Sequence, residues 1–309
     1  MPCRAPHERV QTAVCQLEPM SAVSISFIVT TENAANRCET ILDILKSAKT
    51  DIDEVVVVTS MSGANDSSLL ERSWFKVIGI PGASVFTLRA RVPAIARNDW
   101  VVVLEEHSIV TSATIDAARR LIRDKGNIDL VVFLGKNLTS TGSWGWANFL
   151  HTFAFAWAPI RLPPTFSPVT AVAVRRSAFN TDGPLRDGEW ELSLIPRLFA
   201  TGRTAYSNEI FIDHIRHFSL TSGLAIAFHN ARAGSGLSRN FGRARRAIFD
   251  EGWYAFTQRP AQIVKHHADR WHELPAGVLW RLYAVGLAHL IGNAWGAFLG
   301  PGKSPHKLD

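Results

Sequence analysis

The stretch of sequence that decides the fold is Trp100-Val101-Val102-Val103-Leu104-Glu105-Glu106-His107. Its apolar residues run without alternation, which is typical of a strand that helices cover on both faces of a sheet. Two carboxylates and an imidazole follow directly, at the carboxyl end of this strand, where open α/β sheets bind ligands. The stretch therefore predicts a central strand with a ligand site at its end. A strand end whose polar residues merely face water is the plain alternative.

The segments around this stretch predict a parallel sheet flanked by helices. Further unalternating strands are expected at 24–30, 54–59, 75–80 and 129–134, and helices at 32–49, 84–97 and 111–125. Pro93 is expected to kink the second helix, because proline removes a backbone hydrogen bond. Alternation of such strands with helices is the signature of an α/β fold.

The second half of the chain is less regular. It predicts a strand at 169–174, a helix at 189–201, a short strand at 210–212 and helices over most of 220–300. We therefore expect three parts, which are a loose leader at 1–22, an α/β domain at 23–218 and a helical extension at 219–309.

The composition limits the classes of partner. Lys and Arg number 33 against 27 acidic residues, and this net charge of +6 favours phosphate-bearing ligands or anionic membrane surfaces. No helix-turn-helix, zinc finger or base-stacking motif is present, so nucleic acid is not an expected partner. Cys3, Cys15 and Cys38 are odd in number and lack C-x-x-C spacing, which indicates neither a disulfide framework nor a zinc site. A reducing compartment, the cytoplasm, is therefore expected.

Several segments bear on membrane contact. The aromatic segment 146–160 is too short to span a bilayer, and 277–300 carries Arg281, His289 and Asn293, so no transmembrane helix is expected. The basic run 232–246 is suited to lying on an anionic bilayer, or else is a solvated helix face. Peripheral contact with the inner face of a membrane thus stays open.

The order of motifs resembles that of the family 2 nucleotide-sugar glycosyltransferases, which have the GT-A fold. The segment 88–99 is similar to the family's A-R-N-x-G…A-x-G-D helix, and Glu105-Glu106-His107 to the Glu-Asp-His form of its acidic metal motif. Residues 188–194 are similar to its E-D-W-E-L-S-L motif, and 296–308 to the C-terminus of one bacterial subgroup. The resemblance implies a GT-A type, Rossmann-like and mostly parallel sheet in a divergent bacterial member.

The resemblance also implies a metal site. Glu105, Glu106 and His107 are its expected ligands, together with His214, which falls where the family has a late histidine; His217 is the alternative. Carboxylate oxygens suit a hard cation such as Mg²⁺ or Mn²⁺. Such a cation neutralises a diphosphate leaving group as a Lewis acid.

Other residues are expected at the nucleotide and at the acceptor. Thr30, Glu32 and Arg89 are expected, with the first acid of the metal motif, to contact the donor nucleotide. Glu189 is expected to be the general base that takes the acceptor's proton, with Glu191 as the fallback. Local turn chemistry, a solvated helix face and a helix-dipole contact of Glu189 are the plain alternatives.

The expected function is the transfer of a hexose-type sugar, with inversion, from a nucleotide-diphosphate donor to a glycan, lipid-linked or other acceptor. A second hypothesis is a degenerate, non-catalytic nucleotide- or sugar-binding scaffold that partners a membrane-linked transferase. Two departures from the family motivate it: no carboxylate follows the second strand until Asp66, and Gly188 replaces the first acid of its motif. A dinucleotide enzyme is disfavoured, because no G-x-G-x-x-G follows the first strand.

Overall fold

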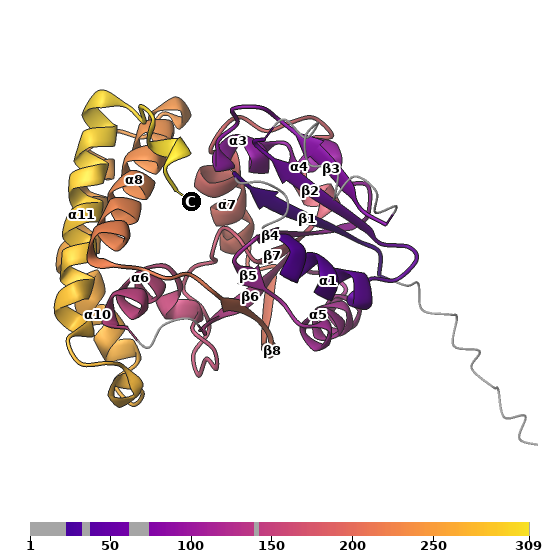
Figure 1. The fold of residues 1–309 in the computed structure, drawn as a ribbon, viewed down its shortest axis with the longest axis horizontal. Helices are drawn as coiled ribbons and strands as arrows, with labels where there is room; N and C mark the ends of the chain where they lie inside the picture. The colour runs from indigo at the N-terminus through magenta and orange to yellow at the C-terminus, as the bar shows by residue number, and fades with distance from the viewer. Residues whose placement is uncertain (1–22, 33–37, 62–73, 139–141, 309) are drawn as a thin grey trace, which may run out of the picture.

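An eight-stranded sheet forms the centre of the molecule (Figure 1). The computed structural model describes residues 23–32, 38–61, 74–138 and 142–308, so the expected leader lies outside the described residues. The strands are β1 (Ile25–Thr31), β2 (Glu54–Thr59), β3 (Lys76–Gly79), β4 (Trp100–Glu105), β5 (Ser108–Ile109), β6 (Leu130–Asn137), β7 (Val172–Arg175) and β8 (Thr204–His214). Their order is β3-β2-β1-β4-β7-β6-β8-β5, and β4 lies inside the sheet as predicted.

The direction of the strands is mostly parallel. Strands β3, β2, β1 and β4 run parallel to one another, and β6 runs parallel to β8. Strand β7 is antiparallel to both of its neighbours, β4 and β6, and the short β5 is antiparallel to β8. The mostly parallel α/β sheet is therefore confirmed, with β7 as the strand that reverses.

Both faces of β4 are buried, which explains its continuous apolar run. Trp100, Val102 and Leu104 join the core on one side of the sheet, and Val101 and Val103 join the core on the other. All five side chains are at most 3% exposed. The polar residues that follow β4 therefore lie outside the two hydrophobic layers, at the edge of the sheet where a ligand can approach.

The helices of the α/β part fall within the expected ranges with two differences: the helix at 143–153 was not expected, and one expected helix is divided. They are α1 (Glu39–Ala48), α3 (Val85–Ala90), α4 (Val92–Ile95), α5 (Ser112–Lys125), α6 (Ser143–Phe153) and α7 (Ile195–Ala200). The segment expected as one kinked helix is two short helices that part at Arg91, and Pro93 lies in the first turn of α4. A proline in a first helical turn loses no hydrogen bond, because its N–H would have no partner there.

Strand β8 is much longer than its sequence suggests. Only 210–212 was expected as strand, but β8 runs from Thr204 to His214. The first half of β8 is mostly polar, which agrees with the exposure of several of its residues to solvent. Polar strands give no apolar run from which to predict them.

Four helices form the extension beyond the sheet: α8 (Leu220–Ser238), α9 (Arg245–Thr257), α10 (Arg259–His266) and α11 (Val278–Leu299). Figure 1 shows α8 and α11 side by side. Glycines allow this close approach, since a Cβ at Gly292 would lie 2.3 Å from the Phe228 carbonyl oxygen and one at Gly296 would lie 2.4 Å from that of Arg232.

Helix α11 is long and apolar enough to cross a membrane by length and composition, and it is alone in this among the described residues. However, 39% of its most apolar stretch is buried against the rest of the protein. Asn293 lies on that buried side, with its side chain 2.5 Å from Ser235 Oγ. The packing of α11 on α8 thus provides a partner for the buried Asn293 side chain.

Candidate functional site

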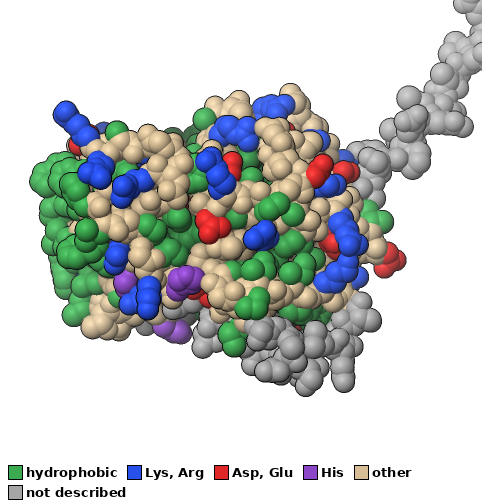
Figure 2. All heavy atoms as spheres, turned by 90° about the horizontal axis from the view of Figure 1, so that it is seen from above, with side chains coloured by type: hydrophobic (Ala, Val, Ile, Leu, Met, Phe, Trp, Pro, Cys, Tyr) green, Lys and Arg blue, Asp and Glu red, His purple; other side chains and the backbone are tan. Residues whose placement is uncertain are grey.

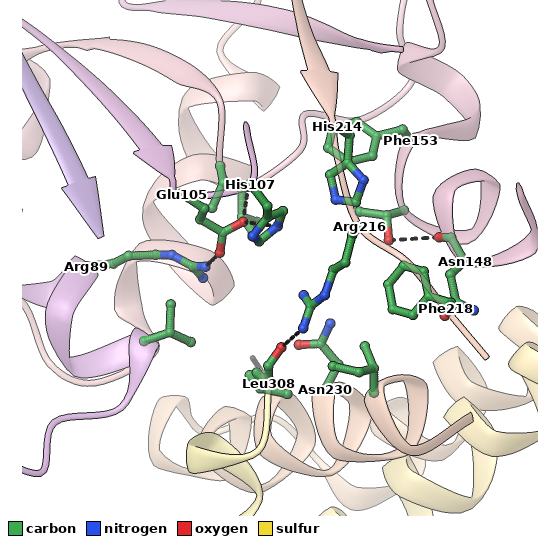
Figure 3. Close-up of a pocket in the computed structure, with 15 residues that line it drawn as sticks. Arg89, Glu105, His107, Asn148, Phe153, His214, Arg216, Phe218, Asn230 and Leu308 are labelled. Atoms are coloured by element: carbon green, nitrogen blue, oxygen red, sulfur yellow. Dashed lines mark hydrogen bonds and ion pairs between the residues drawn. The ribbon is translucent and has the colours of Figure 1, made fainter. Parts of the chain in front are cut away.

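A cavity of about 120 Å³ opens at the carboxyl end of β4 (Figure 3). The charged and imidazole side chains that line it are Arg89, Glu105, His107, His214 and Arg216. They come from α3, the end of β4, the turn after it, the end of β8 and the segment that follows β8. Four of these five residues were expected at a site from the sequence, and the fold brings those four together.

Arg89 bridges two carboxylates at the wall of this cavity. Its Nη1 donates a hydrogen bond of 2.7 Å to Glu191, and its Nη2 donates to Glu105. The side chains of Arg89 and Glu191 are each 7% exposed, so this is a buried network. Burial raises the pKa of Glu191 against the opposing attraction of Arg89. Arg89 therefore reaches the cavity with its charge already balanced by two acids.

Glu105 is held in the ionised form. Burial alone would raise its pKa, but the charges of Arg89 and then of His107 hold this pKa well below its ordinary value. Its second oxygen accepts a hydrogen bond of 3.3 Å from Thr170 and lies 3.3 Å from His107 Nε2. An ionised carboxylate fixed on this wall can accept hydrogen bonds from hydroxyl groups of a bound ligand.

Strand pairing brings His214 beside the predicted acidic motif. Ser108 of β5 pairs with His214 of β8, and the Ile215 N–H donates a 2.9 Å hydrogen bond to the His107 carbonyl. The rings of His107 and His214 meet edge to face, with centroids 5.0 Å apart. Burial and the charge of His107 lower the pKa of His214 to about 3, so His214 is neutral near pH 7.

The expected metal ligands are not arranged as a cation site. The described parts of the chain contain no group of three His, Cys, Asp or Glu side chains placed to hold a metal ion. Glu105 is engaged by Arg89 and Thr170, and Glu106 does not line the cavity. His107 and His214 do line it, but they face each other's rings. The residues present therefore do not fit Mg²⁺ or Mn²⁺ in this arrangement.

Glu191, the partner of Arg89, and three other expected site residues lie outside the cavity lining. Glu32 accepts a 2.5 Å hydrogen bond from the Val85 N–H and so holds the start of α3 to the end of β1. Thr30 is buried and donates to the Leu104 carbonyl. Glu189 accepts a hydrogen bond of 3.0 Å from the Arg186 N–H. In this structure their side chains stabilise local turns and strands.

Arg216 is the functional candidate that the sequence analysis missed. Its guanidinium stands in the cavity, donates to the Leu308 carbonyl and lies over the Phe218 ring, 5.4 Å from its centroid (Figure 3). Leu308 packs with Val85 of α3, so the end of the helical extension closes one side of the cavity. The one sequence signal was the position of Arg216, two residues beyond His214.

Comparison with known proteins agrees with the fold expected from the sequence. No family model matches the chain, and no curated protein matches its sequence. Among solved structures, it is similar to the mannosyltransferase PcManGT from Pyrobaculum calidifontis in complex with GDP-Man and Mn2+, with a TM-score of 0.52 and 17% identity. That likeness covers 88% of this chain and 86% of the other.

Two further likenesses are weaker. Glucosyl-3-phosphoglycerate synthase from Mycobacterium tuberculosis, in complex with Mn2+ and UDP-Glc, has a TM-score of 0.45 and 18% identity over 64% of this chain and 73% of the other. TarS 1-349 of S. aureus has a TM-score of 0.42 and 14% identity over 90% and 92%. At such identities a likeness shows the fold alone, and it is the GT-A fold.

Proposed function

We propose that this chain, which has the GT-A fold, is a glycosyltransferase that moves a sugar from a nucleotide-diphosphate donor to an acceptor. The observation that carries the proposal is the convergence of Arg89, Glu105, His107, His214 and Arg216 on one cavity. This cavity lies at the carboxyl end of the central strand, where α/β sheets bind ligands. Transfer of a hexose with inversion is the finer form of the proposal.

The charges in the cavity suit a nucleotide diphosphate. Arg216 offers a planar guanidinium, which binds phosphate oxygens through paired, charge-assisted hydrogen bonds. Glu105 offers an ionised carboxylate for sugar hydroxyl groups, and the neutral His214 offers one N–H or one lone pair. In this proposal Arg216 binds and orients the diphosphate, while Glu105 orients a sugar ring.

The reaction needs a base that lies within hydrogen-bond reach of the acceptor hydroxyl. Glu189 and Glu191 are the proposed candidates from the sequence. Glu191 is paired with Arg89, and neither Glu191 nor Glu189 is in the lining of the cavity. The effect of Glu189→Gln on turnover therefore decides whether Glu189 is the general base.

The first test is isothermal titration of the protein with GDP and with UDP, each with Mn²⁺, with Mg²⁺ and with a chelator. The three conditions show directly whether nucleotide binding depends on a cation, because the described side chains do not form a cation site by themselves. We expect nucleotide to bind, and Arg216→Ala to weaken the binding at least tenfold. Arg246→Ala is the matched control, because the Arg246 side chain is 94% exposed. No heat with either nucleotide under any condition would overturn the proposal.

A panel of nucleotide sugars, assayed for release of nucleoside diphosphate, separates the enzyme from the scaffold hypothesis. An enzyme releases nucleoside diphosphate from at least one donor, and Glu105→Ala abolishes this release. Nucleotide binding without release from any donor, in the presence of lipid-linked and soluble acceptors, would favour the scaffold.

We also propose that the protein is cytoplasmic and sits peripherally on the inner face of a membrane. Nine large apolar side chains of α9 and α11 are 40–65% exposed: Phe249, Trp253, Leu279, Trp280, Leu287, Ile291, Trp295, Phe298 and Leu299. We call this set the apolar face. Figure 2 shows a dense hydrophobic patch at the left end of the molecule, on the side where α11 lies in Figure 1.

The surroundings of the apolar face favour an anionic bilayer as its occupant. The Arg281 guanidinium lies 4.3 Å from the ring centroid of Trp280, and that of Arg245 lies 5.6 Å from the ring centroid of Phe298. Tryptophan and arginine together are enriched where a helix lies in the headgroup layer. The net charge of +6 attracts the protein to anionic lipid.

A further inference from the structure

A second, larger cavity adjoins the candidate donor cavity. Its volume is about 530 Å³, and it lies between α6, the segment 165–169, α7 and the helices α8, α10 and α11. The two cavities share five lining residues: Asn148, Thr152, Val169, Ile226 and Asn230. A ligand in the larger cavity would therefore lie directly beside one bound in the smaller.

Arg259 lines this larger cavity and makes no ion pair with any described residue. Its Nε is buried without a hydrogen-bond partner. Burial lowers its pKa, and the opposing attraction of Tyr254 and of Glu251, which is paired with Arg243, does not outweigh this effect. The Arg259 guanidinium carbon lies 5.4 Å from the centroid of the Phe166 ring, which also lines the cavity. By contrast, the buried Arg89 and the half-buried Arg119 each have a carboxylate partner. Removing part of a guanidinium from water without such a partner costs free energy, which an anion in the cavity would recover.

Two histidines add a hydrogen-bond donor on the same wall. His151 Nε2 lies 3.3 Å from His289 Nδ1, and both residues line the cavity. Burial, and then the charge of Arg259, lower the pKa of both rings, in His289 to about 4. Both are therefore neutral near pH 7, and since one ring donates its only N–H to the other, the pair keeps one N–H for a ligand.

The rest of the lining carries no negative charge. Its side chains are amides, hydroxyls and apolar groups such as Phe166, Phe199 and Ile226, with no Asp or Glu among them. The cavity thus has one cation, neutral N–H donors and apolar walls. This combination suits a molecule with one anionic group and an uncharged remainder.

We propose that this larger cavity is the acceptor subsite, and that Arg259 binds the anionic group of an acceptor that carries a phosphate. This inference rests on the proposed function of the adjoining cavity. Arg259 holds the phosphate, the His151–His289 pair donates to it, and a hydroxyl of the same molecule faces the shared wall at Asn148 and Asn230. Selection among acceptors then follows from the charge at Arg259.

The test measures binding, so it does not depend on turnover. Inorganic phosphate is titrated into the full-length protein saturated with UDP or GDP, which keeps the smaller cavity occupied. We expect phosphate to bind wild type, Arg259→Gln to weaken this binding at least tenfold, and Arg259→Lys to restore part of it. Arg246→Gln is the control, because the Arg246 side chain is 94% exposed, and it leaves phosphate binding within twofold of wild type. Circular dichroism verifies that each variant is folded, and if Arg259→Gln does not fold, His289→Gln takes its place with a smaller expected loss.

The outcomes separate this inference from the proposed function. Equal phosphate binding by wild type and Arg259→Gln, or no phosphate binding at all, would overturn the subsite while nucleotide binding stands. Phosphate binding that depends on Arg259, in a protein that binds no nucleotide, would support the anion site and overturn the transferase instead.

Two sources of the phosphate are then compared. Glycerol 3-phosphate represents a soluble acceptor, and a short-chain phosphatidic acid below its micelle concentration represents a lipid headgroup. Tighter binding of the second by wild type, lost in Arg259→Gln, assigns the site to lipid phosphate. Tighter binding of glycerol 3-phosphate assigns the site to a soluble phosphate. If wild type binds neither compound, the proposal is contradicted.

Discussion

The guanidinium of Arg89 on α3 forms a buried ion pair with the carboxylate of Glu105 at the end of β4. The same guanidinium also binds Glu191, which lies in the π-helical turn Trp190–Leu194 before α7. One cation therefore joins α3, the central strand and this turn. Removing one member of a buried pair leaves a charge without compensation, which costs more than the pair itself contributes. This network is therefore the most sensitive point of the candidate site.

Arg89→Ala should lower the free energy of unfolding by about 3–5 kcal/mol, because it leaves Glu105 and Glu191 buried without their partner. Urea unfolding measures the change. Arg91→Ala, at the exposed junction between α3 and α4, is the control and should change stability by less than about 0.5 kcal/mol. Equal effects of the two substitutions would contradict the account of this network.

The stability of the protein should fall as the pH falls from about 6.5 towards 4, in part through His289. Burial and then Arg259 lower the pKa of His289 from 6.5 to about 4 in the folded protein. Between these values the unfolded chain binds a proton that the folded chain does not, so acid favours unfolding. The contribution is at most about 3 kcal/mol. Urea unfolding at several pH values should show a flatter profile for His289→Gln, and an unchanged profile would show that His289 is not buried in the neutral form.

Glu189→Gln should leave turnover within about threefold of wild type, because the Glu189 side chain bonds Arg186 and lies outside the cavity. Loss of a general base instead lowers kcat by about 10² to 10⁴. Release of nucleoside diphosphate measures the difference, with Glu105→Gln as the substitution inside the cavity that should abolish it. If Glu189→Gln instead lowers kcat by the larger factor, Glu189 is the general base, and the turn around it must move when substrates bind.

Binding to anionic vesicles should depend on the apolar face. Trp295→Ser and Phe298→Ser should each weaken sedimentation with vesicles that contain phosphatidylglycerol, because each side chain loses apolar area buried in the headgroup layer. Ile52→Ser is the matched control, since Ile52 is about as exposed as Trp295 but lies between α1 and β2, outside the apolar face. Added salt should weaken binding further, because screening reduces the attraction of the arginines. If neither Trp295→Ser nor Phe298→Ser weakens vesicle binding, the apolar face is not the membrane-binding surface.

The tight packing of α11 on α8 gives a test of the helical extension. Gly296→Ala should destabilise the protein by about 1–3 kcal/mol, since its Cβ would lie 2.4 Å from the Arg232 carbonyl oxygen. Gly234→Ala on α8 meets no atom within 4 Å and should stabilise it by about 0.5–1 kcal/mol, because alanine favours the helix. Thermal unfolding measures both, and the same sign for the two substitutions would contradict this packing.

The sequence by itself determined the sheet and its central strand. A run such as Val101 to Leu104 is apolar on both sides, and only a strand covered on both faces buries all of it. The same run placed Glu105 and His107 at the carboxyl end, because a strand fixes the direction in which the chain leaves it. Local periodicity was enough for these conclusions.

Only the tertiary structure decided which residues meet and which are already engaged. The pairing of β5 with β8 sets His107 beside His214, and it joins segments whose polar strands leave no apolar pattern. Arg89 could be placed on a helix near the site, but its two carboxylate partners depend on how α3 packs. Arg259 gave no signal and Arg216 gave only its position near His214, because an arginine in a helix or loop looks alike in sequence whether water or a cavity surrounds it. Contacts between distant segments depend on packing in three dimensions, so they cannot be read from the spacing of residues along the chain.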